Sequence, residues 1–304
     1  MHQETEHIRG SALKTISFLK YRWYAISASL VIITVFSVGT FLRGGFEWGI
    51  DFAGGVKITA QFSGTVKSGD IRKEFEKAEI GAEVQQFGKE EQNQYIVTTK
   101  LLGKGETSEK SSEMVQKVLL DKFPGIKIVG VETVGPAVGA FLKQSAWKLS
   151  LMALALMALY LIFRFEMKFS AGVMLAVLHD VVVAFLFCGF TGVEVNIPII
   201  AAILTIFGFS VNDTIVIFDR VRENMQIKSK HTFTQLLDVS ITETLSRTFI
   251  TSLTVLFCVL ALYVIGEGTI SDFALIMLVG LVSGTYSTVY MAAPVVIWWE
   301  RFKA

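Results

Sequence analysis

Six long apolar runs constrain this chain more than any other feature of its sequence. A helix needs about 20 mostly apolar residues to cross the roughly 30 Å hydrocarbon core of a bilayer. Apolar residues make up 52% of the chain and its mean hydropathy is +0.54, which is more than a soluble domain normally carries. The runs therefore predict a membrane α-helical bundle of six transmembrane helices. They lie near residues 24–42, 147–163, 169–190, 197–218, 248–265 and 273–299.

The first two runs need a closer look. The first is interpreted as a retained helix rather than a signal peptide, because it follows a 23-residue lead and no small-x-small cleavage site follows Leu42. The second is somewhat short, and its helix could begin earlier, within 140–146. The remaining five-helix transmembrane region is predicted to extend over 147–299.

Lysine and arginine residues in the short connections predict the orientation. Basic residues gather on one side of the bundle, whereas the connections 191–196 and 266–272 on the other side contain none. Because basic residues favour the cytoplasmic side, both termini are predicted to be cytoplasmic. The basic connections are the N-terminal segment 1–23, the turn 164–168, the loop 220–247 and the tail 300–304.

Residues 43–146 are hydrophilic and long enough to form an extracytoplasmic domain. Alternating apolar residues predict its strands, and spacings of three to four residues predict its helices. The order β-α-β-β-α-β is that of a ferredoxin-like α+β unit, a fold that hosts many functions. The predicted elements are strand 56–62, helix 70–79, strands 82–87 and 94–101, helix 108–123 and strand 126–134.

Missing motifs argue against most enzymatic classes. Cys188 and Cys258 both lie inside apolar runs, which argues against a disulfide or a metal site. The sequence has no correctly spaced phosphate loop, no H-E-x-x-H motif, no cysteine–histidine cluster and no G-x-S-x-G elbow. The net charge of +1, without a basic stripe, gives no reason to expect nucleic-acid binding. The chain is therefore predicted not to be an enzyme and to need neither metal nor cofactor.

Ionisable residues inside the apolar runs are the candidate functional groups. His179 and Asp180 lie near the middle of the third run, and Asn212 and Asp213 lie in the fourth. Arg247 opens the fifth run. At ~1.5 Å per residue, Asp213 and Arg247 lie roughly 24 and 27 Å from the outer boundary, so they are predicted to be nearly level.

Two interpretations of these groups remain open. In the structural one, Asp213 and Arg247 form an ion pair, while His179 and Asp180 tie helices together by hydrogen bonds. In the functional one, the groups form a proton or cation relay, because carboxylates and histidines that face a bundle interior commonly mark ion pathways. Alternation between paired and separated arrangements would couple protonation to helix movement.

Glycines and an apolar stripe suggest how the parts are joined. Gly49, Gly54 and Gly55 would allow tight turns between the first helix and the first strand, although an ordinary flexible junction explains them equally well. The segment 233–245 carries an apolar stripe that is typical of a helix lying on the membrane face, and packing is preferred over a partner site.

The sixth run is unusually polar for a lipid-facing helix. Its hydroxyl groups between Ser283 and Tyr290 cannot all face lipid comfortably, so some should face protein or water. Gly280 and Gly284 form a G-x-x-x-G pattern, which is a weak indication of close helix packing.

Taken in order, these motifs resemble the SecF family of bacterial protein-export subunits. Single motifs are weak, but the ordered set is specific and covers essentially the whole chain. It consists of "GIDFAGG" (49–55), "LHD" (178–180), "GFSVNDTIVIFDRVREN" (208–224), "TLSRTFITS" (244–252) and "GLVSGTYST" (280–288).

The resemblance implies an inner-membrane subunit that forms half of a twelve-helix permease of the resistance–nodulation–division superfamily. SecD would complete the permease. The SecYEG channel, YajC and the translocating preprotein would be its other partners. The complex would use the proton-motive or sodium-motive force to promote late stages of preprotein export.

The resemblance also implies roles for particular residues. Asp213 would be the ion-coupling carboxylate and Arg247 its basic partner, and Asp180 of the "LHD" motif would be a further ion-coupling residue. The adjacent His179 and Asn212 would be supporting polar groups. Gly49, Asp51, Gly54 and Gly55 would form an extracytoplasmic hinge, and Gly280 and Gly284 a helix-packing motif.

Two other classes remain compatible with the sequence. A half-size ion-coupled exporter of small molecules or lipids would carry the same relay and would line its outer domain with an apolar pocket. A non-conducting assembly scaffold would keep the helix contacts and tolerate a neutral replacement of Asp213.

Overall fold

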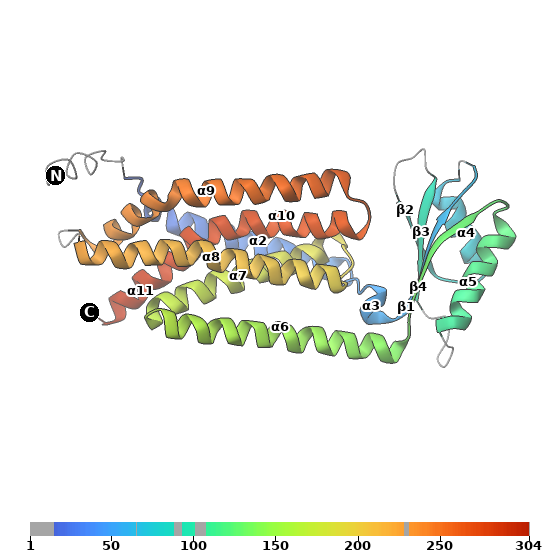
Figure 1. The fold of residues 1–304 in the computed structure, drawn as a ribbon, viewed down its shortest axis with the longest axis horizontal. Coiled ribbons are helices and arrows are strands. Elements are labelled where there is room, and N and C mark those ends of the chain that lie inside the picture. Colours follow the sequence, from blue (N-terminus) through green and yellow to red (C-terminus); the bar gives the residue numbers. More distant parts are fainter. Residues whose placement is uncertain (1–14, 65, 88–92, 101–107, 228–230, 304) are drawn as a thin grey trace, which may run out of the picture.

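A computed structural model describes residues 15–64, 66–87, 93–100, 108–227 and 231–303 of the chain. Most of the predicted N-terminal segment, the end of the predicted strand 94–101 and part of the predicted loop 220–247 lie outside the described residues. The remaining elements form a long helical bundle with a small α/β domain at one end, as Figure 1 shows.

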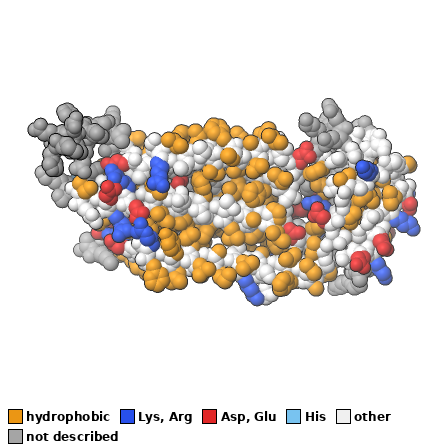
Figure 2. Space-filling view, viewed as in Figure 1, with side chains coloured by type: hydrophobic (Ala, Val, Ile, Leu, Met, Phe, Trp, Pro, Cys, Tyr) orange, Lys and Arg blue, Asp and Glu red, His pale blue; other side chains and the backbone are white. Residues whose placement is uncertain are grey.

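The six predicted membrane helices are present. Within the described residues, six helical segments are long and apolar enough to cross a membrane. Figure 2 shows hydrophobic side chains over the middle of the molecule and charged side chains concentrated towards its two ends. The segments are Phe18–Leu42 (η2 and α2), Pro136–Arg164 (α6), Met167–Thr191 (α7), Ile197–Ile227 (α8), Phe233–Ile265 (α9) and Thr269–Phe302 (α10, η4 and most of α11).

Three membrane helices extend beyond their apolar runs. Helix α6 starts at Pro136, where a proline in the first turn loses no hydrogen bond. Helix α8 continues to Ile227 and α9 starts at Phe233, so the predicted loop 220–247 is largely helical. A capping box between Thr232 and Gln235 begins α9, since each side chain accepts a hydrogen bond from the backbone N–H of the other.

The apolar stripe in the first half of α9 packs inside the protein. Leu236, Leu237 and Ile241 are buried in one cluster with residues of α7, α8, η4 and α11, whereas Leu245 is exposed. The preferred packing role is confirmed, but the stripe belongs to the same continuous helix as the fifth membrane run. It does not form a separate helix on the membrane face.

The outer domain has the predicted ferredoxin-like topology. Its four strands form an antiparallel sheet in the order β2-β3-β1-β4. Apolar residues of β1 and of the two helices meet in one core that includes Ile58, Phe75 and Leu119. The elements are β1 (Gly55–Gln61), α4 (Ser68–Lys77), β2 (Ala82–Phe87), β3 (Gln94–Thr99), α5 (Ser108–Lys122) and β4 (Lys127–Val134).

The polar sixth run is broken into three helical parts. Helix α10 (Thr269–Ser287) passes through a π-helical turn, η4 (Thr288–Ala292), into α11 (Ala293–Lys303). Ser283, Ser287 and Thr288 are buried, which confirms that part of the run faces protein. Such π turns are rare and occur frequently at functional sites.

Candidate ion-coupling site

Asp213 lies on the buried face of α8 with a single, long polar contact. Its side chain is 3% exposed, and the hydroxyl of Ser252 on α9 donates to its Oδ2 at 3.4 Å. Normal hydrogen bonds between two oxygens are about 2.5–3.0 Å long, so this contact is weak. No other hydrogen bond or ion pair reaches the Asp213 side chain from the described residues. The carboxylate is therefore buried but poorly satisfied.

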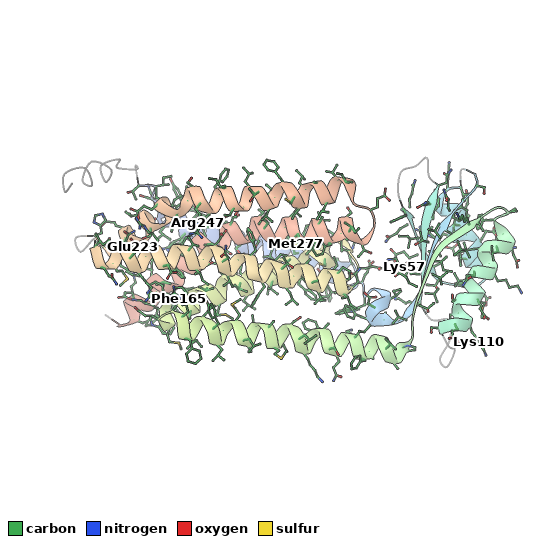
Figure 3. All side chains as sticks on the ribbon, viewed as in Figure 1. Lys57, Lys110, Phe165, Glu223, Arg247 and Met277 are labelled. Atoms are coloured by element: carbon green, nitrogen blue, oxygen red, sulfur yellow. The ribbon has the colours of Figure 1, made fainter. Side chains whose placement is uncertain are left out.

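Arg247 does not form the direct ion pair of the structural interpretation. No contact within 4.0 Å joins its guanidinium to the Asp213 carboxylate, although the structure describes both residues. Arg247 precedes Ser252 by five residues on α9, so it is offset by ~7.5 Å along the helix towards the end remote from the outer domain. Figure 3 shows Arg247 in that half of the bundle. The two residues are neighbours, but they are less level than the sequence predicts.

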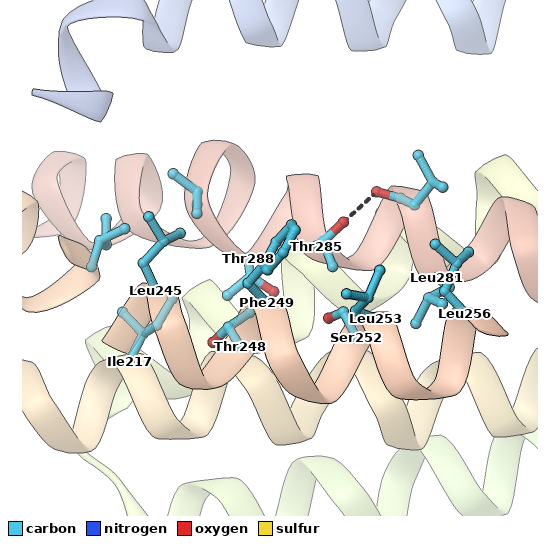
Figure 4. Close-up of a pocket in the computed structure, with 13 residues that line it drawn as sticks. Ile217, Leu245, Thr248, Phe249, Ser252, Leu253, Leu256, Leu281, Thr285 and Thr288 are labelled. Carbon is cyan, nitrogen blue, oxygen red and sulfur yellow. Dashed lines mark hydrogen bonds between the residues drawn. The ribbon is translucent and has the colours of Figure 1, made fainter. Parts of the chain in front are cut away.

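A cavity reaches the Asp213 site between α9 and α10. Its volume is about 210 Å³ and its walls are mostly apolar, with Phe249, Leu253 and Leu281 among them. Figure 4 shows Thr248 and Ser252 of α9 and Thr288 of η4 among its lining residues. Ser252 thus connects the cavity with the carboxylate. Thr248 Oγ1 is buried without a hydrogen-bond partner in the described part of the chain.

Asp180 has a very different environment at the centre of the bundle. Its side chain is fully buried on α7 and accepts hydrogen bonds from three serine hydroxyls. Ser283 donates to Oδ1 at 2.6 Å, while Ser210 and Ser287 donate to Oδ2 at 2.7 and 2.6 Å. Asp180 therefore joins α7, α8 and α10 through short, charge-assisted hydrogen bonds.

The two supporting polar residues separate in the structure. His179 belongs to the Asp180 network, because its Nδ1 lies 3.0 Å from Asp180 Oδ1 and its Nε2 contacts the Ser29 hydroxyl of α2. Asn212 is exposed and lines a shallow cavity against α6. It is adjacent to Asp213 in sequence but lies on a different face of α8. The structure therefore groups His179 with Asp180 and leaves Asn212 apart.

Gly280 permits the close approach that holds α10 against α8. A Cβ atom on Gly280 would lie 2.1 Å from Ile206 Cδ1, which is too close without a shift of the neighbour. At Gly284 a Cβ would make ordinary contacts with Ser210 and Asp180 at 3.6 and 3.7 Å. One turn further on, the hydroxyls of Thr214 and Thr288 lie 3.1 Å apart, so the π turn packs against α8 at the residue that follows Asp213.

The charged end of the bundle contains ion pairs that sequence reasoning missed. Arg220 donates to Glu243 at 2.7 Å and to Glu223 at 2.6 Å. Asn224 also donates to Glu243 and to Ser240. These contacts fix α8 to α9 beyond the predicted membrane boundary. Arg220 and Glu243 lie in the predicted loop 220–247, so the sequence offered no reason to pair them. The structure shows that α8 and α9 both extend into this segment, which brings the two residues together.

A second missed feature lies between the outer domain and the bundle. A cavity of about 900 Å³ is lined by Glu47, Glu79, Glu83 and Glu194, with Lys100 nearby. Burial, followed by repulsion from Glu83, raises the pKa of the Glu194 carboxyl above its ordinary value. The attraction of Lys57 opposes this change.

The "GIDFAGG" segment forms a short helix rather than a loose connection. Helix α3 (Ile50–Ala53) stands between α2 and β1. Gly54 adopts φ 74°, and a Cβ on Gly55 would lie 2.5 Å from the carbonyl oxygen of Thr99. Tight turns are thus required at both glycines, whereas Gly49 has an ordinary extended conformation.

Comparison with known proteins identifies relatives over most of the chain. Residues 114–302 match the model of the protein export membrane protein SecD/SecF C-terminal family, and residues 42–66 match the SecD/SecF GG motif. Protein translocase subunit SecF of Endomicrobium trichonymphae is 35% identical over 92% of this chain and 89% of its own length. The SecF subunit of Vibrio alginolyticus is 35% identical over 93% of this chain and 89% of its own length.

Solved structures of SecDF have the same fold. The chain matches SecDF of Thermus thermophilus, a translocon-associated membrane protein, with a TM-score of 0.84 and 32% identity. That match covers 98% of this chain but only 41% of the SecDF chain. SecDF in its super-membrane-facing form matches with a TM-score of 0.69 and 33% identity over 95% of this chain and 39% of that one.

Proposed function

The chain belongs to the SecD/SecF family of protein-export membrane proteins, and on that premise we propose that it is an accessory subunit of the Sec protein translocase. It promotes the export of preproteins across the bacterial cytoplasmic membrane and uses an ion gradient as its energy source. The predicted membrane location agrees with its six apolar helical segments.

The poorly satisfied carboxylate of Asp213 is the observation that carries the ion-coupling proposal. A buried carboxylate that serves structure alone should be fully hydrogen-bonded, as Asp180 is. Asp213 instead has one long contact, a neighbouring but unpaired Arg247, and a cavity at its Ser252 partner. It can therefore bind and release a proton or a cation. Movement of α9 would bring Arg247 nearer or take it away.

We propose SecD as the partner that completes the permease. The chain spans 41% of the SecDF chain that it matches, so the remainder of that chain has no counterpart here. Helix α9 carries Arg247 and is exposed along most of its length, including Phe249, Phe257 and Ile265. A second bundle packed there would enclose the charge. SecYEG, YajC and the preprotein are the further partners of the proposed complex.

The proposed orientation places the α/β domain outside the cell and both termini inside. It rests on the basic residues of the connections remote from that domain. A membrane-impermeant thiol reagent tests it with single cysteines at Lys110 and Glu223, after both native cysteines are replaced. In intact spheroplasts the Lys110→Cys protein should react, while Glu223→Cys should react only after lysis.

Ion-driven export in vesicles tests the proposed function directly. The chain is reconstituted with SecD and SecYEG, and SecA-primed preprotein translocation is measured with and without an imposed proton or sodium gradient. Stimulation by one gradient is expected only when a preprotein is present. Gradient-driven efflux of a small molecule without preprotein would favour the exporter alternative, and no response to either gradient would favour the scaffold.

The outer domain gives little support to the exporter alternative. That alternative predicts an apolar pocket in the domain, whereas the large cavity beside it is lined by four glutamates. Phe46, Trp48 and Ile50 also line this cavity, so its lining is mixed, and the four carboxylates make it less suited to lipid chains or apolar drugs than an apolar pocket.

A further inference from the structure

The outer domain and the membrane bundle meet at a compact junction built around α3. The chain enters the domain through α3 and leaves it through Gly135 and Pro136 into α6. The residues just before α3 pair with the α7–α8 connection, because Val195 N donates to Glu47 O at 2.7 Å and Gly49 N donates to Val195 O at 3.0 Å. The junction therefore contacts the start of α8, the helix that carries Asp213.

Asp51 makes a short side-chain hydrogen bond across this junction, and Lys57 of β1 adds a longer one of 3.5 Å to Thr269 at the start of α10. The Asp51 Oδ2 accepts a hydrogen bond from the backbone N–H of Ile197 at 2.9 Å, and Ile197 is the first residue of α8. Asn196 caps the same helix from within its own segment, since its Oδ1 accepts from Ile199 N at 3.0 Å. The first N–H groups of a helix lack intrahelical partners, and a negative charge there is favoured by the helix dipole.

The connection between Asp51 and the sheet is short and tightly packed. Phe52 is buried among Val195 and Ile199 of the bundle, and β1 begins only four residues after Asp51. On the other side, Gly139 of α6 lies so close to α3 that a Cβ would be 3.1 Å from Gly54 N and 3.2 Å from Phe52 O. A displacement of the start of α8 would thus be carried into β1 rather than absorbed by a flexible link.

We infer that Asp51 is a positioning residue that ties the start of α8 to the outer domain, so that movement of the Asp213 helix is transmitted to the sheet. The inference rests on the proposed ion-driven function, since that function supplies the movement. It also assigns the "GIDFAGG" segment a role as a clamp, in place of a free hinge.

Two matched variants separate this link from ordinary helix capping. Asp51→Ala and Asn196→Ala each remove one side-chain cap from the same helix end, but only Asp51 belongs to the domain side of the junction. The Asp51 cap is also the contact between domain and bundle, so its loss should shift the equilibrium between joined and separated junction by about fivefold, whereas loss of the Asn196 cap leaves the junction joined. Asp51→Ala is expected to lower gradient-stimulated export at least that much, whereas Asn196→Ala should retain more than half of it. Asp51→Asn keeps an acceptor oxygen and should restore most of the activity. Equal losses in the two alanine variants would overturn the inference.

A covalent replacement of the link gives a second test. A Cβ on Gly49 would lie 3.1 Å from Asn196 Cβ, close to the ~3.5–4.5 Å found in disulfides. Cysteines at these two positions are added to the Asp51→Ala protein after Cys188 and Cys258 are replaced. Oxidation should restore gradient-stimulated export and reduction should abolish it again. Absence of rescue in a protein shown to be fully cross-linked would contradict the role of the link.

A distance measurement is independent of export. Spin labels at Lys110→Cys on α5 and at the exposed native Cys258 on α9 report the position of the domain over the bundle. Asp51→Ala should broaden or shift this distance distribution, and Asn196→Ala should not. Unchanged distances in Asp51→Ala would refute the clamp even if export is active. If the unmodified complex shows no gradient-driven export, the proposed function fails, while this measurement still decides whether Asp51 holds the domain.

Discussion

The two buried carboxylates of the bundle, Asp180 and Asp213, differ in how well their surroundings supply hydrogen bonds. Asp180 accepts three short serine hydrogen bonds and contacts His179, whereas Asp213 has one long contact with Ser252. Burial alone therefore does not distinguish a structural acid from a functional one. We propose that the number and length of the hydrogen bonds distinguish them, because an acid that gains and loses an ion is hindered by a saturated hydrogen-bond network.

This contrast extends to the helices that carry the two acids. In the most apolar 18-residue stretch of each membrane helix, 44% of the residues are buried in α7, 50% in α8 and 56% in the α10–α11 segment. In the corresponding stretches of α2, α6 and α9, only 6–11% of the residues are buried. Asp180 lies among the three packed helices, and Asp213 lies where packed α8 meets exposed α9. Within this chain α9 packs on one side only, so a movement of α9 would displace fewer neighbours in the same chain than a movement of α7 or α8.

Replacement of Asp180 should cause the largest loss. Asp180→Ala leaves the hydroxyls of Ser210, Ser283 and Ser287 without their common acceptor and opens a void between three helices. We expect a destabilisation of about 3–5 kcal/mol, with poor recovery of assembled complex. Thermal unfolding in detergent measures it, with Ser29→Ala as a milder control within the same network. Normal stability combined with loss of ion-driven export would instead place Asp180 on the ion pathway, as the motif resemblance implies.

Replacement of Asp213 should affect function and spare assembly. Asp213→Asn keeps the size and part of the hydrogen bonding but removes the charge and the titratable proton. Gradient-stimulated preprotein export should fall to the unstimulated level, while SecD co-purification and the unfolding temperature stay within the error of the unmodified protein. Asp219→Asn, six residues further along α8 at an exposed ion pair with Arg164, is the matched control and should stay active. Full stimulation of the Asp213→Asn protein would leave Asp213 as a packing residue.

The different surroundings of Asp180 and Asp213 could not be predicted from the sequence, although much of the secondary structure could. Alternation and helical spacing predicted the strands at 82–87 and 126–134 to within a residue, because those signals are local. The Asp180 network joins residues 30, 103 and 107 positions apart, and no local pattern records that Ser210, Ser283 and Ser287 face one point. Likewise, helical periodicity places Asn212 and Asp213 about 100° apart around α8, but it could not tell which of the two faces the bundle until the partners of α8 were known.

Replacement of Arg247 should have a smaller effect. Arg247→Lys keeps the positive charge but loses the planar, multiple-donor geometry of the guanidinium. Because Arg247 is not directly paired with Asp213, we expect a partial loss of ion-driven export, about two- to tenfold, with normal assembly. Arg247→Gln should lose more than Arg247→Lys. A test of pairing uses the joint replacement of Asp213 and Arg247 by apolar residues. Rescue of assembly or function in that double variant would favour the structural ion pair instead.

The smallest effect is expected at Glu194, outside the membrane, where burial and nearby acids disfavour the charged form. Its neighbours are Glu83, Glu47 and Asp272, with Lys57 as the opposing charge. Because the pKa of Glu194 is raised in the folded protein, its contribution to stability is fully present below the ordinary glutamate value of 4.5 and is lost as the pH rises through the raised value.

Glu194→Gln removes that loss. The variant should equal the unmodified protein near pH 4.5 and be more stable than it at about pH 8, as measured by thermal unfolding over this range. Glu79→Gln, an exposed change on the wall of the same cavity, should shift the curve less. The direction of the stability change at high pH bears on the comparison of Asp180 with Asp213.

If the Glu194→Gln protein is less stable than the unmodified protein at high pH, the Glu194 carboxylate is stabilised by hydrogen-bond partners, as the Asp180 carboxyl is. The outer cavity would then be a structural junction. If the Glu194→Gln protein is more stable at high pH, Glu194 resembles Asp213, since both carboxyls would be buried without enough hydrogen-bond partners. The interface between domain and bundle would then weaken as the Glu194 carboxyl ionises.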